Sequence, residues 1–143
     1  MKLLFLMIMT LALGTARGAA PDPISRVVLE SFQNNFRNVD EVSWAEGKYF
    51  FKAEFQFNGQ YVNAFFTKNG YLAATSKNLR FTELPLQLQL DLKGSYTGYW
   101  ISDLFELTRE GSTSYYITLE NADQKIVLES FGNDWSLFNK SSK

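Results

Sequence analysis

The sequence of 143 residues contains no cysteine and no histidine. Without cysteine, the chain has no disulfides, no thiolate nucleophile and no cysteine that could carry a lipid. Without histidine, the Ser-His, Cys-His and histidine-metal arrangements of most hydrolases cannot form. These absences predict a protein that is not an enzyme and that holds neither a metal nor a cofactor.

The first residues have the layout of a secretory signal peptide. Lys2 precedes an apolar run from Leu3 to Leu13, and small residues follow with Arg17 among them. That run is too short to remain as a membrane-spanning helix. We therefore expect a signal peptide at residues 1–20, a single domain at residues 21–143, and no membrane anchor. Because an exported chain without disulfides suits a bacterial periplasm, we expect a periplasmic or secreted protein.

The charge balance of the remaining chain is slightly acidic. Of 14 basic residues, Lys2 and Arg17 lie in the expected signal peptide, which leaves 12 against 15 acidic residues and a net charge of about −3. Nucleic-acid affinity comes mainly from clustered cations, so we expect no nucleic-acid partner.

Two kinds of hydrophobic periodicity follow one another in the first half. Apolar residues stand four apart from Ile24 to Phe36, which predicts an amphipathic helix of about three turns. From Glu41 onward the period changes to two, and the alternating runs are separated at Asn58-Gly59 and Asn69-Gly70. Asn-Gly between alternating runs is a strong hairpin signal, so the helix is followed by about four antiparallel strands.

The sequence repeats itself after 64 residues. At this shift Phe51 falls on Tyr115 and Phe55 on Leu119, and the turns of one half fall on those of the other. The domain is therefore predicted to contain two copies of one unit, at about residues 24–80 and 84–138.

The stretch LPLQLQLDLKGSY, residues 84–96, fits two structures. Its leucines alternate with polar residues as in a strand, while an apolar set also stands four apart as in a helix. The 64-residue shift lays the helical position Val28 on Leu92, which favours a helix at Pro85–Lys93 that stops at Gly94. Leu86 and Leu90 then stand off the buried stripe and need cover from the linker or from strand ends.

Together these patterns predict an α+β fold. Two tandem αβ4 units form one antiparallel sheet of about eight strands, with two helices on one face.

In order and spacing, several features resemble the PepSY-like, β-lactamase-inhibitor-like proteins that Gram-negative bacteria export. They are Trp44, the Asn58-Gly59 and Asn69-Gly70 turns, Leu84-Pro85, and Tyr96-Thr97-Gly98-Tyr99. The resemblance implies a tandem αβ4 fold like that of a secreted β-lactamase inhibitor, whose concave sheet holds an enzyme. The family has no catalytic residues to carry over, and this chain lacks the cysteines that brace the inhibitor. Fold alone does not establish function.

The strand alternation places an unusually aromatic set on the face of the sheet away from the helices. A broad surface of aromatics with a few charges is typical of a protein-binding patch. The other interpretation is that these aromatics form cross-strand pairs, or are covered by the tail and linker. The candidate protein-binding face consists of Phe50, Lys52, Tyr61, Asn63, Phe65, Tyr116, Val127, Glu129 and Phe131.

Other candidate sites are weaker. Trp44, Trp100 and Trp135 could line a ligand pocket, but in so aromatic a chain they are expected to pack in or around the core. Asp40-Glu41 precedes a strand, where a solvated turn is expected, and no calcium-loop spacing occurs.

The sequence leaves two hypotheses for function. The first is an exported protein, a monomer or weak dimer, that binds an unknown protein partner in the periplasm, with inhibition of an enzyme as one form of that binding. The alternative is a carrier of a small apolar or aromatic ligand, because the chain has 13 Phe, 7 Tyr and 3 Trp.

Overall fold

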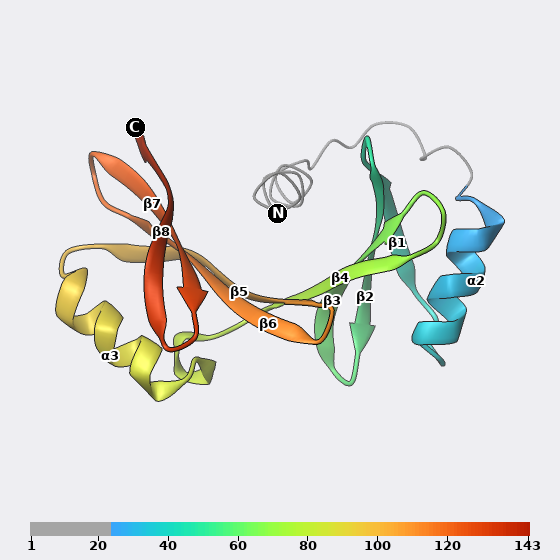
Figure 1. The fold of residues 1–143 in the computed structure, drawn as a ribbon, viewed down its shortest axis with the longest axis horizontal. Coiled ribbons are helices and arrows are strands. Elements are labelled where there is room, and N and C mark those ends of the chain that lie inside the picture. The colour runs from blue at the N-terminus through green and yellow to red at the C-terminus, as the bar shows by residue number, and fades with distance from the viewer. Residues whose placement is uncertain (1–23) are drawn as a thin grey trace. The chain divides into compact units, whose positions relative to one another are not determined.

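The computed structural model describes residues 24–143, so the expected signal peptide at residues 1–20 lies outside the described part of the chain. One helix and four strands are followed by a short 3-10 helix, a second helix and four more strands (Figure 1). In chain order the elements are α2 (Arg26–Asn35), β1 (Val42–Glu46), β2 (Phe50–Phe57), β3 (Gln60–Thr67), β4 (Leu72–Asn78), η1 (Phe81–Glu83), α3 (Leu86–Ser95), β5 (Trp100–Arg109), β6 (Ser112–Glu120), β7 (Gln124–Phe131) and β8 (Asp134–Ser142).

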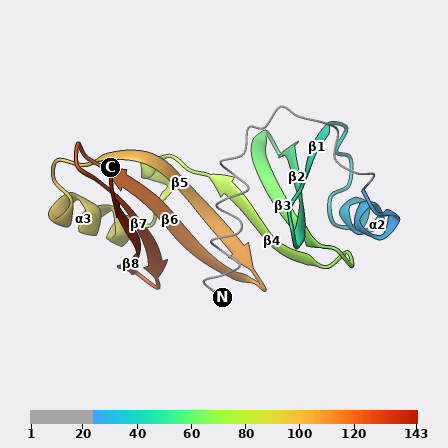
Figure 2. The same cartoon turned by 90° about the horizontal axis from the view of Figure 1, so that it is seen from above.

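The strands form one open antiparallel sheet of eight, in the order in which they occur along the chain. This confirms the predicted α+β fold class with two helices and one sheet. The chain divides into two compact units, one ending at Ala73 and the other running from Ala74 to Lys143. Figure 2 shows each helix beside the strands of its own unit.

The predicted Asn58-Gly59 turn joins β2 to β3. Both residues have positive φ, 50° for Asn58 and 77° for Gly59. These angles are those of the tight turn that matches the twist of paired strands, and asparagine and glycine adopt them at least cost. The turn thereby fixes the register of β2 and β3, in which Phe55 pairs with Val62.

The core of the first unit lies between α2 and the strands. Val28 and Phe32, two residues of the predicted helical stripe, are buried on α2. The Phe32 ring lies 5.0 Å from the Phe55 ring and 5.4 Å from Trp44, both in edge-on contact. Trp44 is therefore a packing residue. The buried cluster comprises Val28, Phe32, Phe51, Ala53, Phe55, Ala64 and Phe66.

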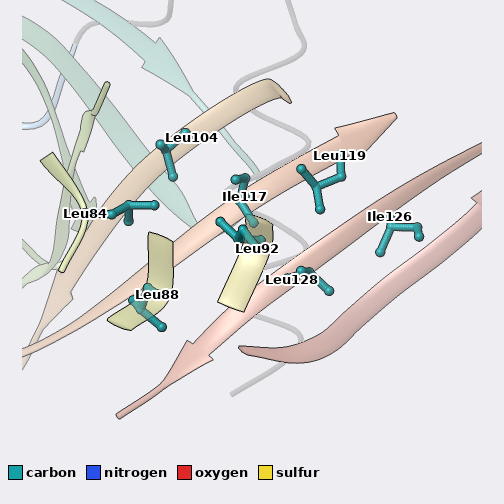
Figure 3. Packing of buried hydrophobic residues seen from close by; sticks show 8 residues of the cluster. All are labelled: Leu84, Leu88, Leu92, Leu104, Ile117, Leu119, Ile126 and Leu128. Atoms are coloured by element: carbon teal, nitrogen blue, oxygen red, sulfur yellow. The ribbon is translucent and has the colours of Figure 1, made fainter. Parts of the chain in front are cut away.

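The core of the second unit has the same plan, with Leu88 and Leu92 of α3 packed against the sheet (Figure 3). Leu88 is fully buried, and the Trp135 indole Nε1 of β8 donates a hydrogen bond to the Leu88 carbonyl oxygen at 3.0 Å. Trp135 thus joins the edge strand to the helix. The cluster comprises Leu84, Leu88, Leu92, Leu104, Ile117, Leu119, Ile126 and Leu128.

The predicted helix over Pro85–Lys93 is confirmed as α3, despite its strand-like alternation. Its predicted stop at Gly94 is wrong, because Gly94 lies inside the helix and Tyr96 ends it by donating its N–H to the Leu92 carbonyl. Leu86 and Leu90 are 69% and 53% exposed, so the expected cover for them is absent within the described residues. Alternate leucines on a helix cannot all face the sheet, and these two point to solvent.

Leu88 and Leu90 are a matched pair on one helix, fully buried and half exposed respectively. We expect Leu88→Ala to lower the free energy of unfolding by about 2–5 kcal/mol, because it leaves a cavity in the core. Leu90→Ala should change it by less than about 0.5 kcal/mol. Urea unfolding followed by circular dichroism measures both values. Equal losses would show that α3 does not present this face to the sheet.

Candidate protein-binding face

In the first unit, four register pairs of β2 and β3 lie on the face away from α2. They alternate with Phe51, Ala53 and Phe55, which pack against the helix. The pairs are Phe50 with Thr67, Lys52 with Phe65, Glu54 with Asn63, and Gln56 with Tyr61.

The aromatic residues of this face differ widely in exposure. Phe65 is 2% exposed and Phe50 7%, whereas Tyr61 is 68% exposed. The expectation that all three are open to water is wrong for Phe50 and Phe65. Tyr61, beside the Asn58-Gly59 turn, is the aromatic residue among the three that a partner can reach directly.

The polar residues of the same face form a small network. The Lys52 ammonium lies 3.4 Å from the Glu54 carboxylate, with 15% of the Lys52 side chain and 49% of the Glu54 side chain exposed. The Asn63 Oδ1 atom is buried without a hydrogen-bond partner among the described residues. A largely buried cation and an acceptor without a partner give this face of the first unit a polar character.

An open groove of about 790 Å³ adjoins this face where β1 begins. Three carboxylates, those of Asp40, Glu41 and Glu54, line it, and no lysine or arginine from residues 24–143 does. The exposed Tyr61 contributes to the same wall. The lining residues are Asn38, Val39, Asp40, Glu41, Val42, Ser43, Glu54, Phe55, Gln56 and Tyr61.

In the second unit, the centre of the corresponding face is occupied by Tyr116. It is 2% exposed, and its ring stacks on Phe105 of β5 with centroids 5.3 Å apart and meets the edge of Phe138 at 5.9 Å. Phe105 and Tyr116 are direct cross-strand partners. Val127, at 3% exposed, is buried as well. The expected exposure is wrong for Tyr116 and Val127. For Tyr116 the reason is cross-strand packing, because its ring is covered by Phe105 and Phe138.

The Tyr116 hydroxyl donates a hydrogen bond to the Glu129 carboxylate on the neighbouring strand. Burial, and secondly the hydrogen bond and the negative charge of Glu129, raise the pKa of the Tyr116 phenol far above its usual value. Tyr116 therefore acts as a neutral donor that holds Glu129 against the sheet.

Phe131 is the most exposed aromatic residue of the candidate set, at 81%, and it lies at the end of β7 just before the turn to β8. The structure thus brings together Tyr116 and Glu129 in one unit, and the four register pairs of β2 and β3 in the other. Lys52, Asn63 and Glu129 are partly exposed.

Sequence reasoning missed Phe105, which supplies the main contact of Tyr116. The alternation along β5 could not be counted through from its start, because the register between β5 and β6 shifts between Ile101 and Asp103. Trp100, before that shift, is 51% exposed, and the Lys143 ammonium lies 4.6 Å from its ring centroid.

The acidic side chains form no metal site within residues 24–143, where no group of three or more potential ligands occurs. Asp103 is partly buried, and burial raises the pKa of its carboxyl group, opposed by the hydrogen bond from the Leu104 backbone N–H. Neither α2 nor α3 combines the length and the apolar character needed to cross a bilayer.

Comparison of the sequence with protein families finds no match, and comparison with curated proteins finds no significant one. Solved structures do match. A BLIP-like protein from Bacteroides fragilis superimposes with a TM-score of 0.70 at 21% identity, over 85% of this chain and 87% of that one. A DUF2874 family protein from Bacteroides uniformis gives 0.72 at 13% identity, over 82% and 88%.

A third structure, provisionally described as periplasmic and from Bacteroides eggerthii, gives a TM-score of 0.71 at 15% identity, over 87% and 90% of the chains. The class that the structure defines is therefore the BLIP-like α+β fold, which confirms the β-lactamase-inhibitor-like part of the resemblance. These neighbours carry BLIP-like and DUF2874 names, and the PepSY name is not confirmed. At such identities the likeness concerns the fold alone.

Tyr61 is exposed on this face and Tyr116 is buried, so substitution of each should affect stability differently. We expect Tyr116→Ser to lower the free energy of unfolding by about 3 kcal/mol or more, because it removes a buried ring and its cross-strand contacts. Tyr61→Ser should cost less than about 1 kcal/mol. Thermal and urea unfolding of both variants provide the measurement, and equal values would mean that Tyr116 is not buried.

The raised pKa of Tyr116 predicts a stability change in alkali. Above pH 10, the usual phenol pKa, the unfolded chain loses the Tyr116 proton while the folded protein keeps it, so stability falls as pH rises. Tyr116→Phe lacks this contribution. At neutral pH the free energy of unfolding should be about 1–2 kcal/mol higher for the native protein than for Tyr116→Phe. This difference should shrink above about pH 10. Urea unfolding at stepped pH tests this, and a constant difference would contradict it.

Proposed function

We propose that this chain is an exported, non-enzymatic protein that binds another protein through the sheet face away from the helices. The observation that carries the proposal is the exposure of Tyr61, at 68%, and Phe131, at 81%, on a face where Phe50, Phe65, Phe105 and Tyr116 are buried. Exposed aromatic anchors on a fixed support are the side chains that dominate protein interfaces.

The rest of the candidate face has a supporting role in this proposal. Phe50, Phe65, Tyr116 and Val127 hold the strands, and Lys52, Asn63 and Glu129 supply partly exposed polar contacts. Because a packed sheet moves little on binding, the contact residues are already in place and little entropy is lost on association. Binding would act by steric occlusion, without chemistry.

The periplasmic location is part of the proposal. It is supported by the signal-peptide pattern of residues 1–20 and by the description of the Bacteroides eggerthii structure. Because the Bacteroides fragilis neighbour is described as BLIP-like, the first partner to test is an enzyme that this protein would inhibit.

The alternative, a carrier of an apolar ligand, gains no support from the groove beside β1. Its lining is mostly polar and includes three carboxylates, whereas sites for apolar molecules are lined predominantly by hydrophobic side chains. The carrier hypothesis stays a prediction from composition.

Affinity capture from the envelope of the host organism tests the proposal. The bait is the mature protein, and retained proteins are quantified for the native bait and for a Tyr61→Ser, Phe131→Ser double variant. We expect the double variant to retain about tenfold less of the specific partner or still less, since loss of an aromatic anchor commonly costs 2 kcal/mol or so.

Leu86→Gln is the matched control, because Leu86 is 69% exposed and lies on α3 instead of the sheet. It should retain the partner at the native level. Equal retention by all three baits would rule out the sheet face as the binding surface.

A further inference from the structure

Among residues 24–143, no strand lies beside the outer edge of β1. β1 is the first strand of the sheet that these residues form, and its partner there is β2. The Gly47 N–H donates to the Phe50 carbonyl at 2.7 Å, which identifies residues 47 and 50 as a hydrogen-bonded pair. Because such pairs alternate along an antiparallel ladder, Val42, Trp44 and Glu46 direct their N–H and C=O groups away from β2.

These three residues therefore present a row of main-chain donors and acceptors along the edge. Within residues 24–143 no main-chain hydrogen bond joins this edge to another element. An unpaired edge is a template for an added strand, and addition of an extended peptide to such an edge is a common mode of protein recognition.

The two sides of the edge differ in chemistry. On the side of α2 stand Val42 and Trp44, both partly exposed and apolar. On the other side lies the acidic groove with Asp40, Glu41 and Glu54, of which Asp40 and Glu41 form no ion pair with the described residues. A strand added here would place alternate side chains on these two sides.

We propose that β1 binds an extended segment of a partner protein in which basic residues alternate with apolar ones. The basic side chains enter the acidic groove and the apolar ones pack beside Val42 and Trp44. This inference rests on the proposed function and names the chemistry of the partner. A second copy of β1 is a poorer occupant, because its residues Val42–Glu46 include no basic side chain that could enter the acidic groove.

A fluorescein-labelled peptide of alternating valine and lysine, seven residues long, is the probe, and fluorescence anisotropy with the full mature protein is the measurement. Binding should weaken with added salt, and the same peptide with glutamate in place of lysine should not bind. Only one alternate set of peptide N–H groups faces β1. Two further peptides carry a methyl group on the backbone nitrogens, one at the lysines and the other at the valines. One of the two should therefore lose binding, while the other binds at the affinity of the unmethylated peptide.

The Glu41→Gln, Glu54→Gln double variant should bind the lysine peptide with an affinity roughly three- to tenfold lower than the native protein does. The loss is modest because partly exposed ion pairs are weak. Glu30→Gln with Asp91→Asn is the matched control, because it removes the same charge from the helices α2 and α3. This control should bind the peptide at the native affinity.

Backbone NMR locates the contact. On addition of the peptide, the amides of Val42, Trp44 and Glu46 should become protected from exchange. Equal binding of the lysine and glutamate peptides, equal binding of the two methylated peptides, or amides already protected in a dimer without peptide would each overturn the proposal. If the peptide fails while Tyr61→Ser with Phe131→Ser still reduces partner capture, the edge inference is wrong and the proposed function stands.

Discussion

One helix can cover only one face of the strands in each unit, and this constraint governs the rest of the structure. Strand side chains alternate between faces, so every second residue points away from the helix. On the face of the second unit away from α3, side chains are buried by cross-strand packing. Tyr116 stacks on Phe105, and its hydroxyl donates a hydrogen bond to Glu129. The strands of the second unit are therefore buried on both sides at their centre, whereas the face of the first unit away from α2 keeps the polar side chains of Lys52, Glu54 and Asn63. Tyr61 and Phe131, the exposed aromatic residues of the candidate set, lie near strand ends.

This arrangement changes how the aromatic composition bears on function. A surplus of aromatic residues away from the helices does not by itself make a binding surface, because Phe65 and Tyr116 are used to stabilise the strands. The residues that we propose for recognition are a smaller set: Tyr61 and Phe131 on the face, and the acidic groove with the free edge of β1 beside it. Side-chain anchors and a main-chain edge are two separate means of holding a partner. The first unit contains both, with Tyr61 on β3 and the free edge on β1.

The fold was largely predictable because the two halves repeat. Locally, residues 84–96 fit a strand and a helix equally well, and only the alignment of Leu92 with Val28 favoured the helix that α3 forms. The cover of the second face was not predictable. Alternation assigns Tyr116 to a face but says nothing of what packs on it, and the register shift after Ile101 concealed its partner Phe105. The groove at β1 depends on how residues 38–43 approach β2, which no local pattern encodes.

The most direct test of the buried centre is hydroxyl-radical footprinting of the native protein, read residue by residue. If cross-strand packing covers the centre of the face and leaves its ends free, Tyr61 and Phe131 are oxidised nearly as fast as in the unfolded chain, while Phe65 and Tyr116 are protected. Similar oxidation of all four side chains would contradict this, since it would mean that the whole face is open to water.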